Sequence, residues 1–186
     1  EGVNATYPSG FAQVLDFYNG GLSSDGTTGT DYGISFSSEA LAICLNSDTV
    51  SCSNTTRGGL APGSDKGGLF FLSGSETILT MASGFDTGFS FFYSQIQPNN
   101  GIIKVFDDVN GTGNLLASFN LPTTPSGCPG YPGAYCPFVA QGVSFAGIGK
   151  SVSFGGVANY VVFDDITFGS ATPVITGGVP EPSTWA

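Results

Sequence analysis

Two adjacent carboxylates, Asp164 and Asp165, stand in the middle of the apolar run VVFDDITFG. If this run is a strand, its side chains alternate between two faces, and Asp164 shares a face with Val162, Ile166 and Phe168. An unpaired carboxylate among apolar side chains costs free energy unless a cation or several backbone N–H groups bind it. Because no Lys or Arg is close in the sequence, the pattern favours a structural Ca²⁺ at Asp164. A carboxylate that is hydrogen-bonded at a sheet edge is the alternative.

The four cysteines form two pairs of equal spacing, and each pair brackets a loop rich in Ser and Asn or in Pro and Gly. Three pairings are possible in principle, and local pairing is the simplest. A four-cysteine zinc site normally needs C-x2-C knuckles, which this sequence does not have. We therefore expect disulfides Cys44–Cys52 and Cys128–Cys136, which imply an oxidising compartment.

The composition of the chain argues against several functions. The 186 residues include no His and only 4 Lys and Arg against 14 Asp and Glu, so the formal net charge is −10. Without His the chain lacks the most common general base and transition-metal ligand, and we do not expect an enzyme. Its negative field repels phosphate groups, which argues against nucleic acid and anionic membranes as partners. There is also no run of about 18 apolar residues, so we expect no membrane span.

No segment has a sustained helical pattern, whereas short β-branched and aromatic runs predict strands. These strands must position the carboxylates and cysteines described above. The run DDVNGTGN lacks the Glu that closes an EF-hand loop, and it predicts a hairpin turn with Asn110 and Gly111 at its tip. We predict an all-β fold, an antiparallel two-sheet jelly-roll-like sandwich over residues 1–169 with long disulfide-stapled loops, followed by an extended tail over 170–186. The predicted strands are Gln13–Tyr18, Tyr32–Phe36, Ala40–Leu45, Leu69–Leu72, Thr77–Ala82, Phe89–Tyr93, Ile102–Phe106, Leu115–Leu121, Gly142–Phe145, Ser151–Phe154 and Tyr160–Phe168.

The C-terminal residues VPEPSTWA resemble the sorting motif of PEP-CTERM surface proteins, with the motif at Val179, Pro180, Glu181, Pro182 and Ser183. Segments of the body are similar to segments that recur in the same order in one subfamily: LDFYNGG, DYGISFSSEALAI, GFDTGFSFFYS, VFDDVNGTGNLLASFNLP and VVFDDITFGS. The resemblance implies an exported protein of Gram-negative bacteria that an exosortase sorts to the outer surface or the extracellular matrix.

The segment FDDI is also similar to the calcium-binding strand of jelly-roll carbohydrate-binding modules. This similarity implies that further ligands come from the N-terminal part, near Asp16 to Gly21. The calcium set that we expect is therefore Asp164, Asp165 and Asp16.

Two functions of different classes remain. The first is an extracellular structural protein that assembles into filaments or a biofilm matrix, favoured because few charges need desolvation at a packed interface. In that case Val174 and Trp185 are the expected assembly contacts. The second is a carbohydrate-binding module that anchors exopolysaccharide at the cell surface through an aromatic platform. Candidates for that platform are Tyr32, Tyr93, Tyr131 and Tyr135.

Overall fold

The structure is a computed structural model that describes Val3 and residues 10–45, 61–62, 64, 67–95, 101–125, 127 and 135–175. In these residues no helix has the length and the hydropathy needed to cross a membrane. The elements are eleven strands and two short 3-10 helices. They are β1 (Phe11–Gln13), η1 (Phe17–Asn19), β2 (Ile34–Phe36), β3 (Leu41–Cys44), β4 (Gly67–Phe70), β5 (Glu76–Phe85), β6 (Gly88–Gln95), β7 (Ile102–Phe106), η2 (Val109–Gly111), β8 (Leu115–Asn120), β9 (Val139–Ser144), β10 (Gly149–Gly155) and β11 (Val161–Phe168).

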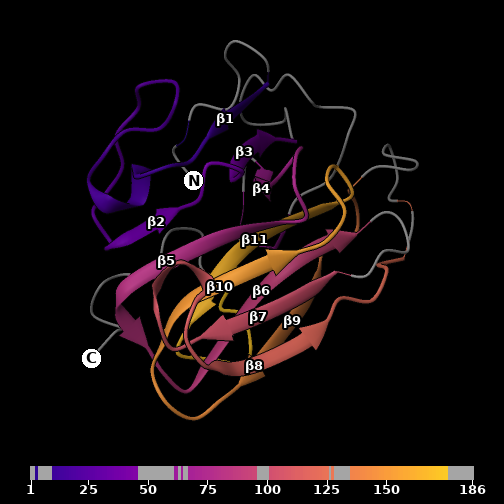
Figure 1. The fold of residues 1–186 in the computed structure, drawn as a ribbon. Helices are drawn as coiled ribbons and strands as arrows, with labels where there is room; N and C mark the ends of the chain where they lie inside the picture. Colours follow the sequence, from indigo (N-terminus) through magenta and orange to yellow (C-terminus); the bar gives the residue numbers. More distant parts are fainter. Residues whose placement is uncertain are drawn as a thin grey trace.

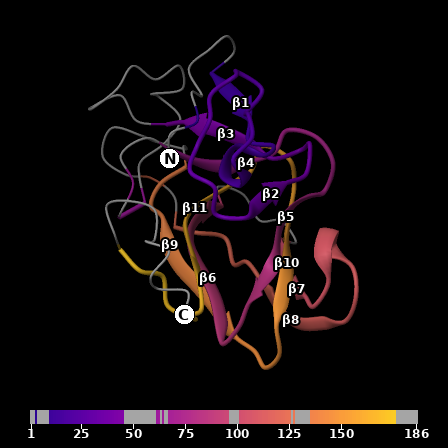
Figure 2. The same cartoon turned by 90° about the vertical axis from the view of Figure 1, so that its left-hand side faces the viewer.

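The strands form two antiparallel sheets that pack face to face (Figure 1). The six-stranded sheet has the order β1-β3-β4-β11-β6-β9, and the five-stranded sheet has the order β2-β5-β10-β7-β8. Figure 2 shows the layers from the side, with β9, β6 and β11 in one and β10, β7 and β8 in the other. Only two pairs of neighbours within the sheets, β3 with β4 and β7 with β8, are consecutive in the sequence, so the chain crosses between layers many times. The predicted two-sheet antiparallel sandwich is confirmed.

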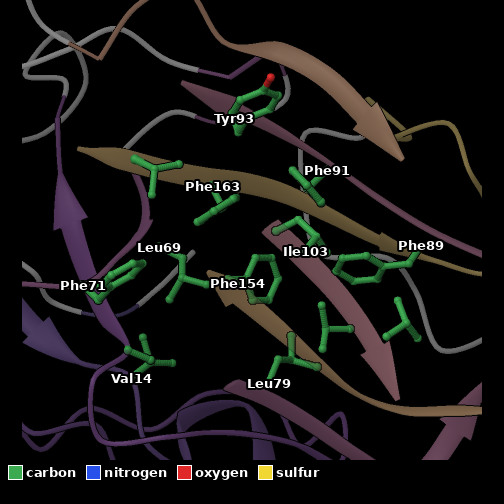
Figure 3. Close-up of a cluster of buried hydrophobic side chains, with 14 of the residues drawn as sticks. Val14, Leu69, Phe71, Leu79, Phe89, Phe91, Tyr93, Ile103, Phe154 and Phe163 are labelled. Carbon is green, nitrogen blue, oxygen red and sulfur yellow. The ribbon is translucent and has the colours of Figure 1, made fainter. Parts of the chain in front are cut away.

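Between the sheets lies a cluster of buried side chains that we call the inner cluster (Figure 3). Strand alternation builds it, because Phe89, Phe91 and Tyr93 of β6 point into the sandwich and the residues between them point outward. The ring centroid of Phe91 lies 5.4 Å from that of Phe163 and 5.9 Å from that of Phe154, both in edge-to-face geometry. Burial of each such ring contributes about 1.5–3 kcal/mol. The inner cluster comprises Val14, Phe17, Ala40, Leu69, Phe71, Leu79, Met81, Phe85, Phe89, Phe91, Tyr93, Ile103, Val105, Leu121, Val152, Phe154, Val161 and Phe163.

A second, smaller cluster lies on the opposite face of the six-stranded sheet, and we call that face the outer face. Its residues alternate with those of the inner cluster along the strands: Phe70 follows Leu69 in β4, and Val162 follows Val161 in β11. The six-stranded sheet is thus covered on both faces, and every residue of β6 is buried. Any polar side chain on β6 must therefore find its partners inside the protein. The outer cluster comprises Ile43, Leu45, Ala61, Phe70, Phe92, Tyr135, Phe138 and Val162.

All eleven predicted strands overlap observed ones, but the first is displaced. The sequence predicted a strand at Gln13–Tyr18, whereas β1 ends at Gln13 and the chain then turns into η1. Leu15 adopts a φ of +51°, which interrupts the extended backbone, and Phe17 enters the inner cluster from the 3-10 turn. The predicted hairpin tip is confirmed, since Asn110 and Gly111 lie between β7 and β8 with φ of +57° and +71°.

Only one cysteine of each predicted disulfide lies in the described part of the chain. Cys44 and Cys136 are both buried and are disulfide-bonded rather than free. Their predicted partners, Cys52 and Cys128, lie outside the described residues. The pairing therefore stays a prediction.

Candidate functional site

A β-bulge in β11 sets the position of the two adjacent carboxylates. In the pairing of β11 with β6, Asp164 lies opposite Phe92 and Thr167 lies opposite Ser90, so three steps along β11 match two along β6. The extra residue is accommodated where Asp165 adopts a φ of +48°, in the left-handed region that non-glycine residues rarely occupy. The bulge reverses the alternation of side chains along the rest of β11.

This reversal corrects one expectation from the sequence. Period two predicted that Asp164 shares a face with both Val162 and Ile166. Asp164 does lie on the outer face with Val162, but Ile166 and Phe168 pack against the inner cluster. The extra residue at Asp165 returns the two large apolar side chains to the core and leaves Asp164 behind on the outer face.

Only one of the two carboxylate oxygens of Asp164 accepts a hydrogen bond. Its Oδ1 accepts a hydrogen bond from the backbone N–H of Asp165 at 2.9 Å, and Ser64 supplies a side-chain hydrogen bond. Its Oδ2 is buried and has no hydrogen-bond partner, although the residue as a whole is half-buried. Burial raises the pKa of Asp164 to about 7; the Asp165 charge adds to the rise, and the Ser64 hydrogen bond opposes it. An unsatisfied buried group of this kind costs about 1–3 kcal/mol, or more when charged.

Two serines of β6 lie on the same face as Asp164 and, like it, have a buried side-chain oxygen without a hydrogen-bond partner. Ser90 and Ser94 alternate with Phe92 on the outer face, and both are fully buried. The Oγ atom of each has no hydrogen-bond partner. Because Phe92 pairs with Asp164, the two hydroxyls stand one alternation step before and after the carboxylate on the neighbouring strand.

The segment that follows β11 covers the outer face near Ser90. Ala171 packs against Gly88 and Gly142, where a Cβ would overlap its backbone: a Cβ at Gly88 would lie 2.7 Å from the Ala171 nitrogen. The N–H of Val174 donates to Oγ1 of Thr167 at 3.1 Å. Residues 169–175 therefore lie on the outer face above β6 and β9, and the rest of the predicted tail lies outside the described residues. Glycines at positions 88 and 142 are what allow this close approach.

The three predicted calcium ligands are not gathered into one cluster. In the described part of the chain no group of three or more His, Cys, Asp or Glu residues is placed to hold a metal ion. The exposed Asp16 precedes η1, and its backbone oxygen accepts from the N–H groups of Asn19 and Gly21. Calcium binding by the full set stays a prediction.

Two of the four tyrosines predicted to form a sugar-binding platform are buried. Tyr93 and Tyr135 are each 2% exposed, and their hydroxyls donate to the backbone oxygens of Pro122 and Asn159, so both are core residues. The half-buried Tyr32 instead neighbours Tyr18, with ring centroids 6.4 Å apart. Tyr18 was missed because the sequence placed it in a strand rather than in a 3-10 turn.

The remaining predicted positions lie outside the described residues. These are Tyr131, the sorting motif Val179–Ser183 and Trp185. Val174 is described, and its side chain is about half exposed.

Comparisons with known proteins give this architecture no family. A scan of protein-family models finds no match, and a search of curated proteins finds no relative. The resemblance to PEP-CTERM proteins therefore rests on the sequence segments alone.

Proposed function

We propose that the chain is an exported, non-enzymatic structural protein of the PEP-CTERM type, which assembles with copies of itself at the outer surface of a Gram-negative cell. The observation that carries the proposal is a pair of exposed apolar side chains at the end of the segment above β6 and β9. Val174 is 48% exposed and Ile175 is 62% exposed, and they are neighbours in the chain. Exposed apolar side chains that cluster are typical of interaction surfaces, whereas single ones are common anywhere.

The charge of the molecule supports the same proposal. Only 10% of the residues are charged, against about 25% in typical domains. Few ions have to lose their hydration when two such surfaces meet, and desolvation of ions is a main cost of burying a surface. The product that we propose is a filament or a biofilm matrix.

The strand order supports the jelly-roll prediction. Counting β4 as the first of eight strands, one sheet has the order first, last, third, sixth, and the other has second, seventh, fourth, fifth. That path is the double Greek key of a jelly roll, to which β1, β2 and β3 add at one side. We propose that disulfides Cys44–Cys52 and Cys128–Cys136 staple its loops, as suits an exported protein.

Electron microscopy and sedimentation velocity of the purified protein test the assembly. We expect particles larger than the 18.9 kDa monomer. Replacing Val174 and Ile175 by Ser should reduce assembly at least tenfold without changing the thermal stability, because both side chains are exposed. Leu22→Ser is the matched control, since Leu22 is 55% exposed in a different loop and should leave assembly intact. A monodisperse monomer at high concentration, or equal loss in the control, would contradict the proposal.

Carbohydrate binding is the second candidate, and the Tyr18–Tyr32 pair favours it. Both rings are half-buried, and the exposed carboxylates of Asp16 and Asp31 lie beside them in the sequence. Aromatic rings flanked by hydrogen-bonding groups are the usual lining of small polar ligand sites. The ligand in this case is a neutral polysaccharide, because the negative charge of the chain disfavours an acidic one.

A further inference from the structure

We propose that Asn19 is a modification site, at which the folded chain deamidates spontaneously to aspartate and isoaspartate, whereas the fold protects a second pair of the same sequence, Asn110–Gly111. The inference goes beyond the proposed assembly and carbohydrate binding and depends on neither. It rests on two Asn-Gly pairs, Asn19–Gly20 and Asn110–Gly111, which the structure places in different hydrogen-bonding environments. A third pair, Asn100–Gly101, includes a residue outside the described part of the chain.

Deamidation at an Asn-Gly pair needs water but no enzyme, and asparagine is among the thermally labile residues. The backbone nitrogen of the glycine attacks Cγ of the asparagine, the C–N bond of the side-chain amide breaks, and ammonia leaves with the proton that the glycine nitrogen gives up. The resulting five-membered succinimide takes up one water molecule and opens to aspartate or isoaspartate, so no oxidant or other reagent is required. Glycine favours ring closure because it has no Cβ beside the attacking nitrogen and its backbone turns easily.

The two described pairs are alike in sequence, in exposure and in the conformation of the glycine. Asn19 and Asn110 are both exposed, so water reaches both side chains. The glycines have nearly the same φ, +70° at Gly20 and +71° at Gly111. A difference in rate between the two pairs must therefore come from the hydrogen bonds that hold the reacting groups.

Two hydroxyl groups of the five-stranded sheet hold the Asn110–Gly111 pair. The N–H of Gly111 donates to Oγ of Ser151 at 2.8 Å, so the nitrogen that would attack is already engaged. The hydroxyl of Thr80 donates to Oδ1 of Asn110 at 3.3 Å and accepts from its backbone N–H at 3.1 Å. The hairpin tip also lies against Ile78, because a Cβ at Gly111 would be 3.0 Å from its Cδ1. Ring closure turns the peptide unit between Asn110 and Gly111 and would break these bonds.

The Asn19–Gly20 pair lies at the end of η1 and lacks such hydrogen bonds. The N–H groups of Asn19 and Gly21 both donate to the backbone oxygen of Asp16. Among the described residues, neither the N–H of Gly20 nor the side-chain amide of Asn19 has a hydrogen-bond partner. A 3-10 helix of three residues opens at little cost, and the glycine nitrogen can then approach Cγ of Asn19.

The reaction would change a defined part of the surface. Asn19 follows Tyr18 in the chain, and Gly20 packs against Asp31, whose Cβ would lie 3.5 Å from a Cβ at Gly20. Conversion adds one negative charge to the turn that already carries Asp16, and isoaspartate also lengthens the backbone by one carbon atom. The turn that positions Tyr18 is therefore the part of the fold that changes as the protein ages.

Peptide mass spectrometry after incubation of the protein in mildly alkaline buffer, with isoaspartyl methyltransferase to detect isoaspartate, tests the proposal. In the folded protein we expect conversion at Asn19 to be at least tenfold faster than at Asn110. In urea both pairs are solvated, and the two rates should agree. Agreement in urea together with a difference in native buffer assigns the difference to the fold.

Two variants should release the protected pair. Ser151→Ala and Thr80→Val should each raise the rate at Asn110 several-fold and leave the rate at Asn19 unchanged. Ser153→Ala is the matched control, because Ser153 is a buried serine of the same strand whose hydroxyl bonds a side chain of β5 instead of the hairpin tip. If Ser151→Ala does not fold, Thr80→Val decides. Equal rates at the two pairs in the folded protein, no conversion at Asn19, no response of Asn110 to either variant, or an equal response to Ser153→Ala would each overturn the proposal.

Discussion

At the scale of single residues, Asp164 is the group whose environment departs furthest from that of an ordinary surface carboxylate. Its position follows from two neighbours: Phe92, which faces it on β6, and Asp165, which takes up the bulge. Burial of Oδ2 disfavours the charged form, and the second carboxylate adds to that effect. The charged form of Asp164 therefore costs free energy in the folded chain.

The pH dependence of stability in metal-free buffer follows from this environment. The pKa of Asp164 is about 7 in the folded chain, against 3.8 for an unperturbed aspartic acid, so the folded state holds its proton more tightly than the unfolded state. The free energy of unfolding should then be highest below pH 4 for this group and fall as the pH rises from about 4 to about 7, by at most about 4 kcal/mol. Urea unfolding of wild type and Asp164→Asn across this range measures the effect, and other carboxylates cancel in the difference. A difference that stays constant with pH would show that Asp164 ionises normally.

At the scale of elements, the sequence predicted the strands well and their faces less well. Alternation placed Asp164 with Val162 correctly, because the two residues precede the bulge. It misplaced Ile166, because a bulge depends on the register between β11 and β6, and no local pattern records that register. The strand predicted through Leu15 failed for a related reason: burial of Phe17 from a turn outweighs the preference of the run for extended backbone.

Only part of the candidate site could be predicted from the sequence, because the rest depends on how the strands pack. Asp164 is found by a rule that applies to the sequence alone, since a carboxylate in an apolar strand needs a partner. Ser90 and Ser94 carry no such signal, because a serine that alternates with Phe is usual on a solvent-facing strand. They become notable only when the outer face is covered, which the fold decides.

The contact between β9 and the segment above it gives a prediction at this scale. A Cβ at Gly142 would lie 2.6 Å from the Cβ of Ser90 and would overlap the backbone oxygen of Ala171, so Gly142→Ala should displace the segment. Overpacking of this kind costs about 1–3 kcal/mol. We expect a lower melting temperature and faster hydrogen exchange at the Val174 amide, whose bond to Thr167 depends on the segment. Ser144→Ala, at an exposed position of the same strand, is the control; equal exchange in both variants would mean that the segment is not held by this contact.

At the scale of the whole molecule, the two candidate functional surfaces lie on different sides of the sandwich. The Tyr18–Tyr32 pair belongs to η1 and the loop before β2, and β2 is an edge of the five-stranded sheet. Val174 and Ile175 lie above β6 and β9, and β9 is an edge of the six-stranded sheet next to β8, the opposite edge of the five-stranded one. The figures agree, with β2 and β9 well separated in both views (Figures 1 and 2).

Because the surfaces are separate, their functions should be lost separately. Tyr32→Ala removes one ring of the half-buried pair and should reduce retention on a neutral polysaccharide column several-fold if the chain binds carbohydrate, while assembly stays unchanged. The double variant Val174→Ser and Ile175→Ser should do the reverse, since neither side chain is near the aromatic pair. Tyr160→Ala is the control for the loss of an exposed ring, because Tyr160 is 36% exposed and belongs to the turn before β11 rather than to either surface. Affinity electrophoresis and sedimentation velocity on the same samples measure both properties.

If wild type and Tyr32→Ala are retained equally while the double variant alone loses assembly, the structural function stands and carbohydrate binding by this pair is excluded. If the double variant assembles normally and Tyr32→Ala alone loses retention, the chain is a binding module instead.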